Sequence, residues 1–546
     1  MACNTSTRIA ILLALPLTTL GAQAQQDHSH HGDALGTVHF QTSCSPEVAA
    51  SFMRAVALLH SFGYEEARRA FEEVAAGDSR CGMAHWGIAM TWWHPLWAPP
   101  TAAELTSGQK AAATARAIGG GTPRERAYIE AISSFFEDAG TRSHQTRAVA
   151  YRERIARIAG EFQDDTEASI FYALSLLATA PPADATFANQ KQAADILNRI
   201  SREHPDHPGI VHYLIHAFDF PRLAREALPA ARAYAKIAPA SPHALHMPTH
   251  IFTRLGLWQE SIDANRASAR AAREQVARTH PGAASYDALH ALDYLVYAYL
   301  QIDDQPQARA AADEAAAARR FDEPSFAAGY AIAAVPARWT LERREWRAAA
   351  ALEPPAVELP WQQFPYAVAI TRFAQAVGAA RSGQLDRARR AVEALRSIQQ
   401  QLTATPVAGP YDWAGQVESM QLAASAWVSR AEGRDDEALA HARAGAELEE
   451  KIGKHPVTPG AVLPARELLG DLLLELDRPL EALRAFETSL MEAPNRFNSL
   501  AGAARAAARS GQRDKAGEFY RRLLTQADDE SARPEIREAR AFLDGL

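Results

Sequence analysis

Small residues recur at intervals of 34 along the middle of this chain. Ala193, Ala227 and Ser261 each lie early in an apolar run that follows a turn and has helical spacing, and Pro205 and Pro239 keep the same step. A unit of this length has room for two helices and a turn, but it cannot bury its apolar face alone. Successive units must therefore stack, so the period predicts an all-α solenoid, a superhelix of helix-turn-helix repeats.

The same spacing recurs near both ends of the chain, in the segments FGYEEARRAFEEV, EALRAFETSLMEAP and DKAGEFYRRL. In these segments a small residue stands where two helices would cross closely, and Pro494 stands where a second helix would end. They resemble the consensus of the tetratricopeptide repeat (TPR) superfamily. The chain is also similar to secreted bacterial TPR proteins of unassigned activity. The resemblance implies a TPR-like α-solenoid with a concave groove for ligands, and it implies no particular activity.

Composition divides the chain into six expected segments. The first three are a signal peptide (1–24), a flexible His-rich leader (25–44) and N-terminal repeats (45–140). The next three are central His-rich repeats (141–320), irregular helical repeats rich in proline and tryptophan (321–410) and C-terminal repeats (411–546).

The first segment has the features of a cleavable secretory signal. One cation, Arg8, precedes an apolar run from Ile9 to Leu20, and an Ala-Gln-Ala triplet at 22–24 offers a cleavage site. A membrane anchor is the weaker alternative, because the run is shorter than the ~20 residues needed to cross a bilayer. The sequence therefore predicts a periplasmic or secreted protein without a membrane span.

Two cysteines would remain after cleavage, and export would place them in an oxidising compartment. Cys44 and Cys81 each precede the first helix of a neighbouring unit. We predict a disulfide between them, and two separate buried thiols are the alternative.

The charge pattern argues against some partners. The formal net charge is -8, and basic residues are scattered among acidic ones without forming a stripe. We therefore expect no nucleic-acid partner and no binding to anionic membrane surfaces. A solenoid of this kind is expected to hold a protein, a peptide or a small molecule in its concave groove.

Histidines are concentrated in the central repeats. His212 and His216 form a pair at i, i+4 spacing, and His246 and His250 form a second pair 34 residues further on. Both members of such a pair lie on one side of a helix, where they can bind one metal ion. His243 lies within the same arc as the second pair. We predict that these five imidazoles face one another across neighbouring first helices.

The next unit extends this pattern. Aligned across an insertion, His290, Asp293 and Tyr297 take the positions that histidines hold in the unit before. We therefore predict His290 and Asp293 as further metal ligands. Asp293 could instead act as a general base, and Tyr294 or Tyr297 could orient a substrate or donate a proton.

The ligand types suggest a transition metal. Imidazole suits several such ions, and a carboxylate beside histidines suits zinc or ferrous iron, so the predicted cofactor is copper, zinc or iron. Three functions stay open: a binding solenoid with a metal in its groove, a metal-dependent hydrolase or oxidoreductase, and a metal-free scaffold for protein–protein interaction. No HExxH, GxSxG or phosphate-binding glycine loop offers a competing catalytic site.

Other histidines are expected to be structural. His207, beside a proline, is predicted at a turn. His60, His85 and His94 lie among aromatic residues near helix ends, which favours core or capping positions.

Overall fold

The computed structural model describes residues 1–2, 34–96, 99–182, 184–407, 409, 411–528 and 531–545. Apart from residues 1–2, the predicted signal peptide and the first part of the predicted leader lie outside these residues. The described chain is a succession of helices, and its only strand-like feature is an isolated bridge between Ala284 and Phe321.

The helices fall into N-terminal, central and C-terminal groups. The first group is α1 (Ala49–His60), α2 (Tyr64–Gly77), α3 (Gly82–Met90), α4 (Ala102–Ile118), α5 (Pro123–Phe136), α6 (His144–Glu161), α7 (Thr166–Ala178) and α8 (Ala188–Ile200). The central group is α9 (Pro208–Phe218), α10 (Leu228–Ile237), α11 (Pro242–His246), α12 (Pro248–Arg254), α13 (Trp258–Thr279), α14 (Tyr286–Gln301) and α15 (Gln305–Ala317). The last group is α16 (Phe326–Glu342), α17 (Trp346–Ala350), α18 (Pro365–Arg381), α19 (Leu385–Ala404), α20 (Trp413–Ala431), α21 (Asp435–Ile452), α22 (Ala465–Glu475), α23 (Pro479–Glu492), α24 (Phe497–Arg509), α25 (Arg513–Gln526) and α26 (Pro534–Asp544). Short 3₁₀ turns cover Pro46–Val48, Ala224–Ala227 and Trp361–Gln363.

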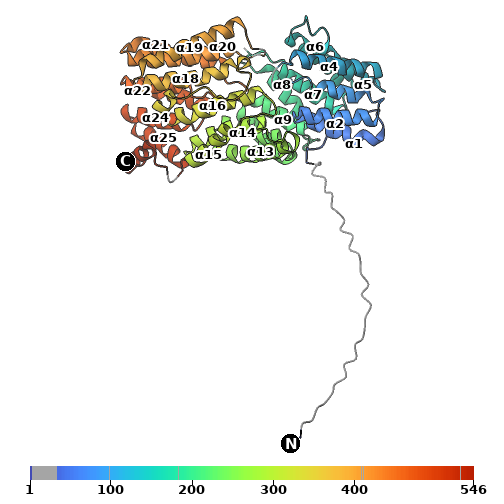
Figure 1. Cartoon of the computed structure of the whole chain (residues 1–546), viewed down its shortest axis with the longest axis horizontal. Helices are drawn as coiled ribbons and strands as arrows, with labels where there is room; N and C mark the ends of the chain where they lie inside the picture. The colour runs from blue at the N-terminus through green and yellow to red at the C-terminus, as the bar shows by residue number, and fades with distance from the viewer. Residues whose placement is uncertain are drawn as a thin grey trace.

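Consecutive helices pack as pairs along the superhelix. The N-terminal helices lie on the right of Figure 1, α13 to α15 run along its lower edge, and the C-terminal helices lie on the left. Contacts join α9 to α10, α12 to α13, and α14 to α15. Ala193, Ala227 and Ser261 are fully buried, as the close approach of paired helices requires. The predicted all-α, TPR-like solenoid is confirmed.

Local sequence signals set where several helices begin. Thr101 and Thr122 each accept a hydrogen bond from the backbone N–H of a glutamate three residues later, and that glutamate caps the threonine N–H in return. Pro208 and Pro242 occupy the first positions of α9 and α11. A backbone N–H at this position has no acceptor within the helix, so proline loses no hydrogen bond there. The two helices that carry most of the histidines therefore have defined starts.

The segment from residue 34 to 44 packs against the first repeats. Leu35, Val38 and Phe40 are buried, and the ring of Phe40 meets that of Trp86 edge to face. The backbone N–H of Thr37 also donates to the carbonyl of Asp206. The prediction of a flexible leader is therefore wrong for this part, because its spaced apolar side chains enter the core without helical periodicity.

Cys44 and Cys81 form the predicted disulfide, with their Cα atoms 4.9 Å apart. Cys81 is buried and precedes the first residue of α3. The bond ties the segment before α1 to the start of the second helix pair.

The superhelix turns far enough for its C-terminal repeats to contact its central ones. The indole N–H of Trp258 donates to the carbonyl of Asn495, and Arg338 donates to the carbonyls of Gly460 and Ala461. The last two residues belong to the segment 453–464 between α21 and α22, which we call the bridging loop. The chain itself therefore covers part of the concave side of the central repeats.

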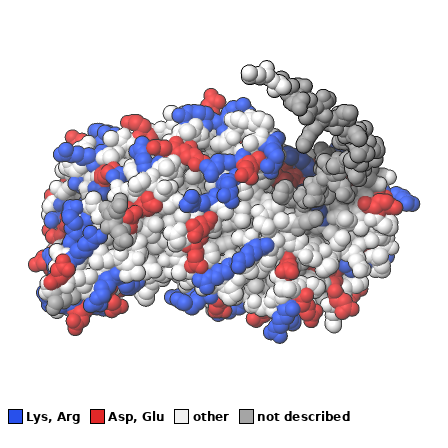
Figure 2. Space-filling model, turned by 90° about the horizontal axis from the view of Figure 1, so that it is seen from below, with Lys and Arg blue, Asp and Glu red and all other residues white. Residues whose placement is uncertain are grey.

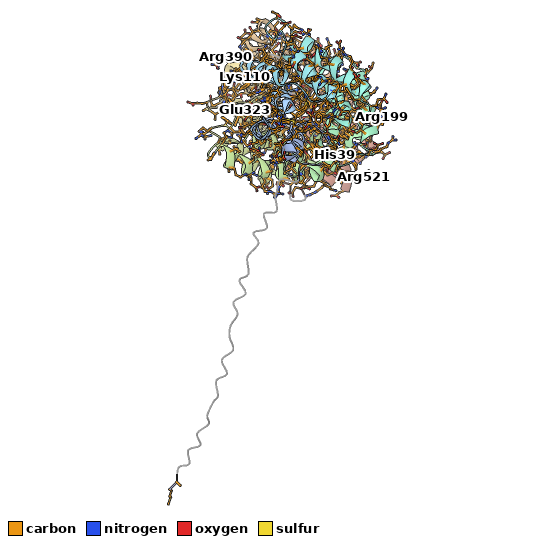
Figure 3. All side chains as sticks on the ribbon, turned by 90° about the vertical axis from the view of Figure 1, so that its right-hand side faces the viewer. His39, Lys110, Arg199, Glu323, Arg390 and Arg521 are labelled. Atoms are coloured by element: carbon orange, nitrogen blue, oxygen red, sulfur yellow. A yellow bond between two sulfur atoms is a disulfide. The ribbon has the colours of Figure 1, made fainter. Side chains whose placement is uncertain are left out.

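The outer surface carries mixed charge. Lys and Arg alternate with Asp and Glu over the face shown in Figure 2. In the end-on view of Figure 3, Arg199 of α8 and Arg521 of α25 lie at the outer edge. No helix in the described part of the chain is both long and apolar enough to cross a membrane.

Candidate metal centre

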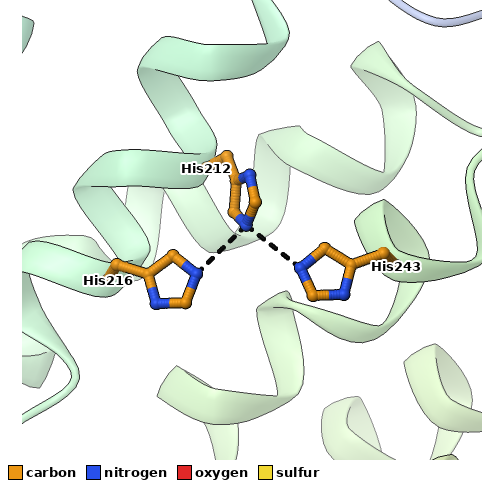
Figure 4. Close-up of side chains that lie close together, drawn as sticks. All are labelled: His212, His216 and His243. Carbon is orange, nitrogen blue, oxygen red and sulfur yellow. Dashed lines mark hydrogen bonds between the residues drawn. The ribbon is translucent and has the colours of Figure 1, made fainter. Parts of the chain in front are cut away.

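His212, His216 and His243 form a first set of converging imidazoles (Figure 4). The first two lie one turn apart on α9, and His243 lies on α11. Nε2 of His212 is 3.1 Å from Nε2 of His216 and 3.1 Å from Nε2 of His243. Around a tetrahedral zinc ion with bonds of about 2.0–2.1 Å, two ligand nitrogens would lie about 3.3 Å apart. The observed separations are thus close to an edge of such a coordination shell.

His246, His250 and His290 form a second set. Nε2 of His246 is 3.2 Å from Nε2 of His250, and the ring centroids of His246 and His290 are 4.3 Å apart. The ligand atoms within each set lie within 4.8 Å of one another. The sets are also neighbours, because the ring centroids of His216 and His250 are 6.4 Å apart. Three successive first helices therefore bring six histidines together.

Proline interrupts the helix that carries the second set. Pro248 has no N–H to donate, and the helix divides into α11 and α12 although Met247 keeps helical backbone angles. His246 and His250 remain one turn apart on either side of this break. Both side chains consequently stay directed at the same centre.

Oxygen atoms hold the second ring nitrogen of three of these histidines. The pairs are Nδ1 of His212 with the carbonyl of His60 (2.6 Å), Nδ1 of His246 with Oδ1 of Asn265 (2.8 Å), and Nδ1 of His250 with Oδ2 of Asp219 (3.1 Å). These oxygens accept and cannot donate, so each Nδ1 carries the proton and each Nε2 presents a lone pair. The two facing lone pairs of His246 and His250 have no hydrogen between them, and a metal cation would satisfy both.

Two cations hold Asp219 in its ionised form. Its carboxylate pairs with Arg254 at 2.9 Å and with Lys454 of the bridging loop at 2.9 Å. Burial alone would raise the pKa of Asp219, but these cations outweigh burial and hold the pKa well below its usual range. Burial also lowers the pKa of His250, which favours the neutral imidazole that binds metals.

Asp293 and Tyr297 lie on α14 but are directed away from both sets. Asp293 Oδ1 accepts from Nε of Arg338 at 2.9 Å, with both side chains buried. The hydroxyl of Tyr297 accepts from Arg496 at 2.9 Å. Arg338 lies on α16 and Arg496 directly precedes α24, so Asp293 and Tyr297 serve the contacts of α14 with these two helices. The structure thus corrects the prediction that Asp293 and Tyr297 share the histidine site.

Tyr294 borders the second set. Its hydroxyl donates to the carbonyl of Val457 in the bridging loop at 3.1 Å and lies 3.4 Å from Nδ1 of His250. Its ring meets the ring of His246 edge to face. The structure therefore places this candidate residue beside the converging histidines, between them and the bridging loop.

A third group of titratable side chains lies behind the first set. Glu167 accepts from Nε2 of His60 at 2.8 Å and from Nε2 of His207 at 2.9 Å, and the hydroxyl of Tyr213 bonds to Nδ1 of His60. The predicted core position of His60 is confirmed, and His207 lies at the predicted turn, as the N-cap of α9, where it is also buried. The carboxylate of Glu167 lies between the two imidazoles and holds both by hydrogen bonds. This group supports the first set, because the carbonyl of His60 accepts from Nδ1 of His212.

A cavity of about 350 Å³ reaches His243 from the side of α2 and α14. Carboxylates dominate its charged lining, including Glu66, Asp287 and Glu323. Burial and the neighbouring carboxylates raise the pKa of Asp287 to about 8, so this side chain is largely uncharged at neutral pH and the negative charge of the cavity comes from its other carboxylates. Such a cavity concentrates cations near the first histidine set.

Several of the supporting residues were missed by sequence reasoning. Asp219 follows His216 by three residues, which is a local signal that could have identified it. Asn265 and His60 lie in other helices, and His60 is 152 residues from the histidine that it contacts. Their roles depend on how the repeats stack.

No family model matches this chain, and no curated protein matches it. Among solved structures, yeast Tom70 is 10% identical, with 91% of this chain and 95% of that chain covered and a TM-score of 0.33. The APC/C hetero-tetramer Cut9-Hcn1 is 13% identical, with coverages of 91% and 89% and a TM-score of 0.32. The human IFIT1 dimer with m7Gppp-AAAA is 14% identical, with coverages of 81% and 90% and a TM-score of 0.39. These likenesses are low, so the fold assignment above rests on the helix pairs of this chain.

Proposed function

We propose that this protein is an exported metal-binding solenoid, in which each of two neighbouring three-histidine sets holds a transition-metal ion. The contact between His246 and His250 carries the proposal. Their Nε2 atoms are 3.2 Å apart while oxygen acceptors hold both Nδ1 protons. A buried pair of facing lone pairs is unfavourable, and a metal ion between them removes the repulsion.

The ligand type favours copper or zinc. Each set offers imidazole nitrogen without a carboxylate, since Asp293 pairs with Arg338. Iron sites commonly add a carboxylate to their histidines, whereas imidazole alone suits copper and zinc. Copper binds such nitrogen sites more tightly than zinc at equal availability.

The surroundings suit a small cation better than a large partner. His212, His246 and His250 are at most 3% exposed, so a protein or peptide in the concave groove would not reach their rings. The acidic cavity beside His243 offers a cation a route inward. Binding of a larger partner elsewhere in the groove stays a separate prediction.

Elemental analysis of the untagged protein tests the proposal. We expect roughly two equivalents of copper or zinc per chain in the wild type, since each set can hold one ion. The variants His212→Ala/His216→Ala and His246→Ala/His250→Ala should each retain roughly half of this metal.

His39→Ala is the matched control, because His39 is exposed and belongs to no converging set. Circular dichroism shows whether each variant keeps its helices. Equal metal content in the wild type and both folded double variants, even after reconstitution, would overturn the proposal.

A second candidate is a metal-dependent enzyme, and the number of ligands favours it. Three protein ligands leave one position of a tetrahedral ion open, as in catalytic zinc sites. Loaded protein would then turn over a hydrolytic or oxidative substrate, and folded His246→Ala protein would not. Undiminished turnover in that variant would exclude the second set from the reaction.

The disulfide supports the proposal of export, since such bonds persist in oxidising compartments. Fractionation of the producing cells tests this part. We expect the chain in the periplasm or medium, with a mature N-terminus that begins after residue 24. A cytosolic chain that retains these residues would contradict it.

A further inference from the structure

A second enclosed site lies between α14, α16, α18, α20 and the bridging loop. It is a cavity of about 130 Å³, which we call the aromatic pocket. Its ring-bearing lining residues are Tyr297, Tyr330, Tyr366, Tyr411, Trp413 and His455. No histidine of either metal-facing set lines it, so this pocket is separate from the centre described above.

The walls of the aromatic pocket are already ordered. Tyr366 and Trp413 stack with ring centroids 3.9 Å apart and planes 16° apart. Trp413 and His455 stack at 5.0 Å and 24°. Tyr411 meets Trp413 edge to face, and its hydroxyl is held by Gln416. Stacked and bonded rings lose little further freedom when a ligand binds.

Two largely buried side chains of this wall carry a polar atom without a protein partner. Tyr366 is 3% exposed and Trp413 is 8% exposed. The hydroxyl of Tyr366 and the indole N–H of Trp413 make no hydrogen bond to any described residue. Both atoms remain accessible to a water-sized molecule. Because both atoms stay accessible and have no protein acceptor, each is free to donate to a ligand that enters the pocket.

His455 adds a third donor. Its Nδ1 accepts from the backbone N–H of Val457 at 3.2 Å, so in the neutral ring the proton is on Nε2. Burial beside Lys454 lowers the pKa of His455 to about 3, which keeps the ring neutral. The pocket thus presents O–H and N–H donors from three rings, and a complementary ligand must supply an acceptor.

We propose that the aromatic pocket binds a small uncharged molecule with one aromatic ring and an acceptor oxygen, such as an aryl ketone or aldehyde. Its volume is near the ~150 Å³ of an apolar protein cavity that holds one benzene ring. The stacked rings would receive the ligand ring, and Tyr366 and Trp413 would donate to its oxygen. This inference does not depend on metal binding.

The pocket and the metal centre share two wall residues. Arg254 and Lys454 line the aromatic pocket, and both hold Asp219, the Nδ1 partner of His250. A ligand in the pocket therefore contacts side chains that support the second histidine set. Binding should be measured on metal-free and metal-loaded full-length protein, so that either proposal can fail alone.

Calorimetric titration with acetophenone tests the inference. We expect saturable binding at one site, weakened about fivefold by Tyr366→Phe and by Trp413→Phe, since each change removes one neutral hydrogen bond. Toluene keeps the ring without the oxygen, and cyclohexyl methyl ketone keeps the oxygen without the aromatic ring. Both should bind more weakly than acetophenone.

Tyr172→Phe is the matched control, because Tyr172 lies on α7 away from the pocket. It should bind acetophenone as the wild type does. Thermal unfolding verifies that all three variants fold. Absence of saturable binding, or binding that neither pocket variant weakens, would overturn the inference.

Discussion

At the residue scale, the partner of Nδ1 decides what each buried histidine can do. In His246 and His250 an oxygen accepts a hydrogen bond from Nδ1–H, which leaves the lone pair of Nε2 directed at the centre. In His60 both ring nitrogens are occupied by protein groups, with Glu167 on one side and Tyr213 on the other. The first arrangement suits metal binding, and the second suits support.

Asp219→Asn should weaken metal binding at the second set. The change removes the negative charge that orients His250, and loss of such a partner typically costs 10–100-fold in metal affinity. Competition with a chelator of known affinity measures this loss. Asp313→Asn, on the exposed face of α15, is the matched control and should leave affinity unchanged. Wild-type affinity in Asp219→Asn would show that the carboxylate does not support the ligand.

Asp293→Ala should lower stability and leave metal content unchanged. It removes the partner of Arg338 at a site where both side chains are at most 1% exposed. An unpaired buried charge of this kind costs about 3–5 kcal/mol, which urea unfolding would measure. If the variant instead lost metal while keeping its stability, Asp293 would be a ligand.

At the scale of elements, the range of a contact determines what the sequence could predict. The i, i+4 pairs and the 34-residue period are properties of one helix and one repeat, so both histidine pairs were predictable. The division into two sets, with His243 joining the first and His290 joining the second, depends on how three helices stack. Asp293 was misassigned because α14 packs on two sides, and the repeat alignment does not say which side faces α16.

The disulfide holds the end of the segment 34–44, which was predicted to be flexible and is packed in the structure. It closes a segment of 37 residues between the chain before α1 and the start of α3. In the chain-entropy model such a closure contributes about 4 kcal/mol. Cys44→Ser/Cys81→Ser should therefore lower the free energy of unfolding by about this amount, measured with denaturant. Reduction of the wild type should give a similar loss, and unchanged stability would mean that packing of residues 34–44 suffices alone.

At the scale of the whole molecule, the bridging loop joins the C-terminal repeats to the candidate metal centre. Its Lys454 pairs with Asp219, and its Val457 carbonyl accepts from Tyr294 beside His250. Arg338 of α16 also donates to its Gly460 carbonyl. A solenoid that could otherwise flex is thus closed over the six histidines by polar contacts distant in sequence. Ions bound beneath this loop would leave when it opens locally.

Lys454→Met should increase the rate of metal release. Its effect on the intrinsic affinity of the histidines for the metal should be smaller. The substitution keeps an apolar stem but removes the cation, so the loop loses a buried ion pair that is 7% exposed on each side. We expect release to a chelator to speed up on the order of a hundredfold, since loss of a buried charge partner weakens the closed state by about 3 kcal/mol. Stopped-flow transfer of metal to a chromogenic chelator measures the rate.

Lys451→Met, on the exposed last turn of α21, is the control and should release metal at the wild-type rate. Equal rates in both variants would mean that metal leaves through the acidic cavity beside His243 without opening of the loop, and Glu66→Gln would then be the variant that changes the rate.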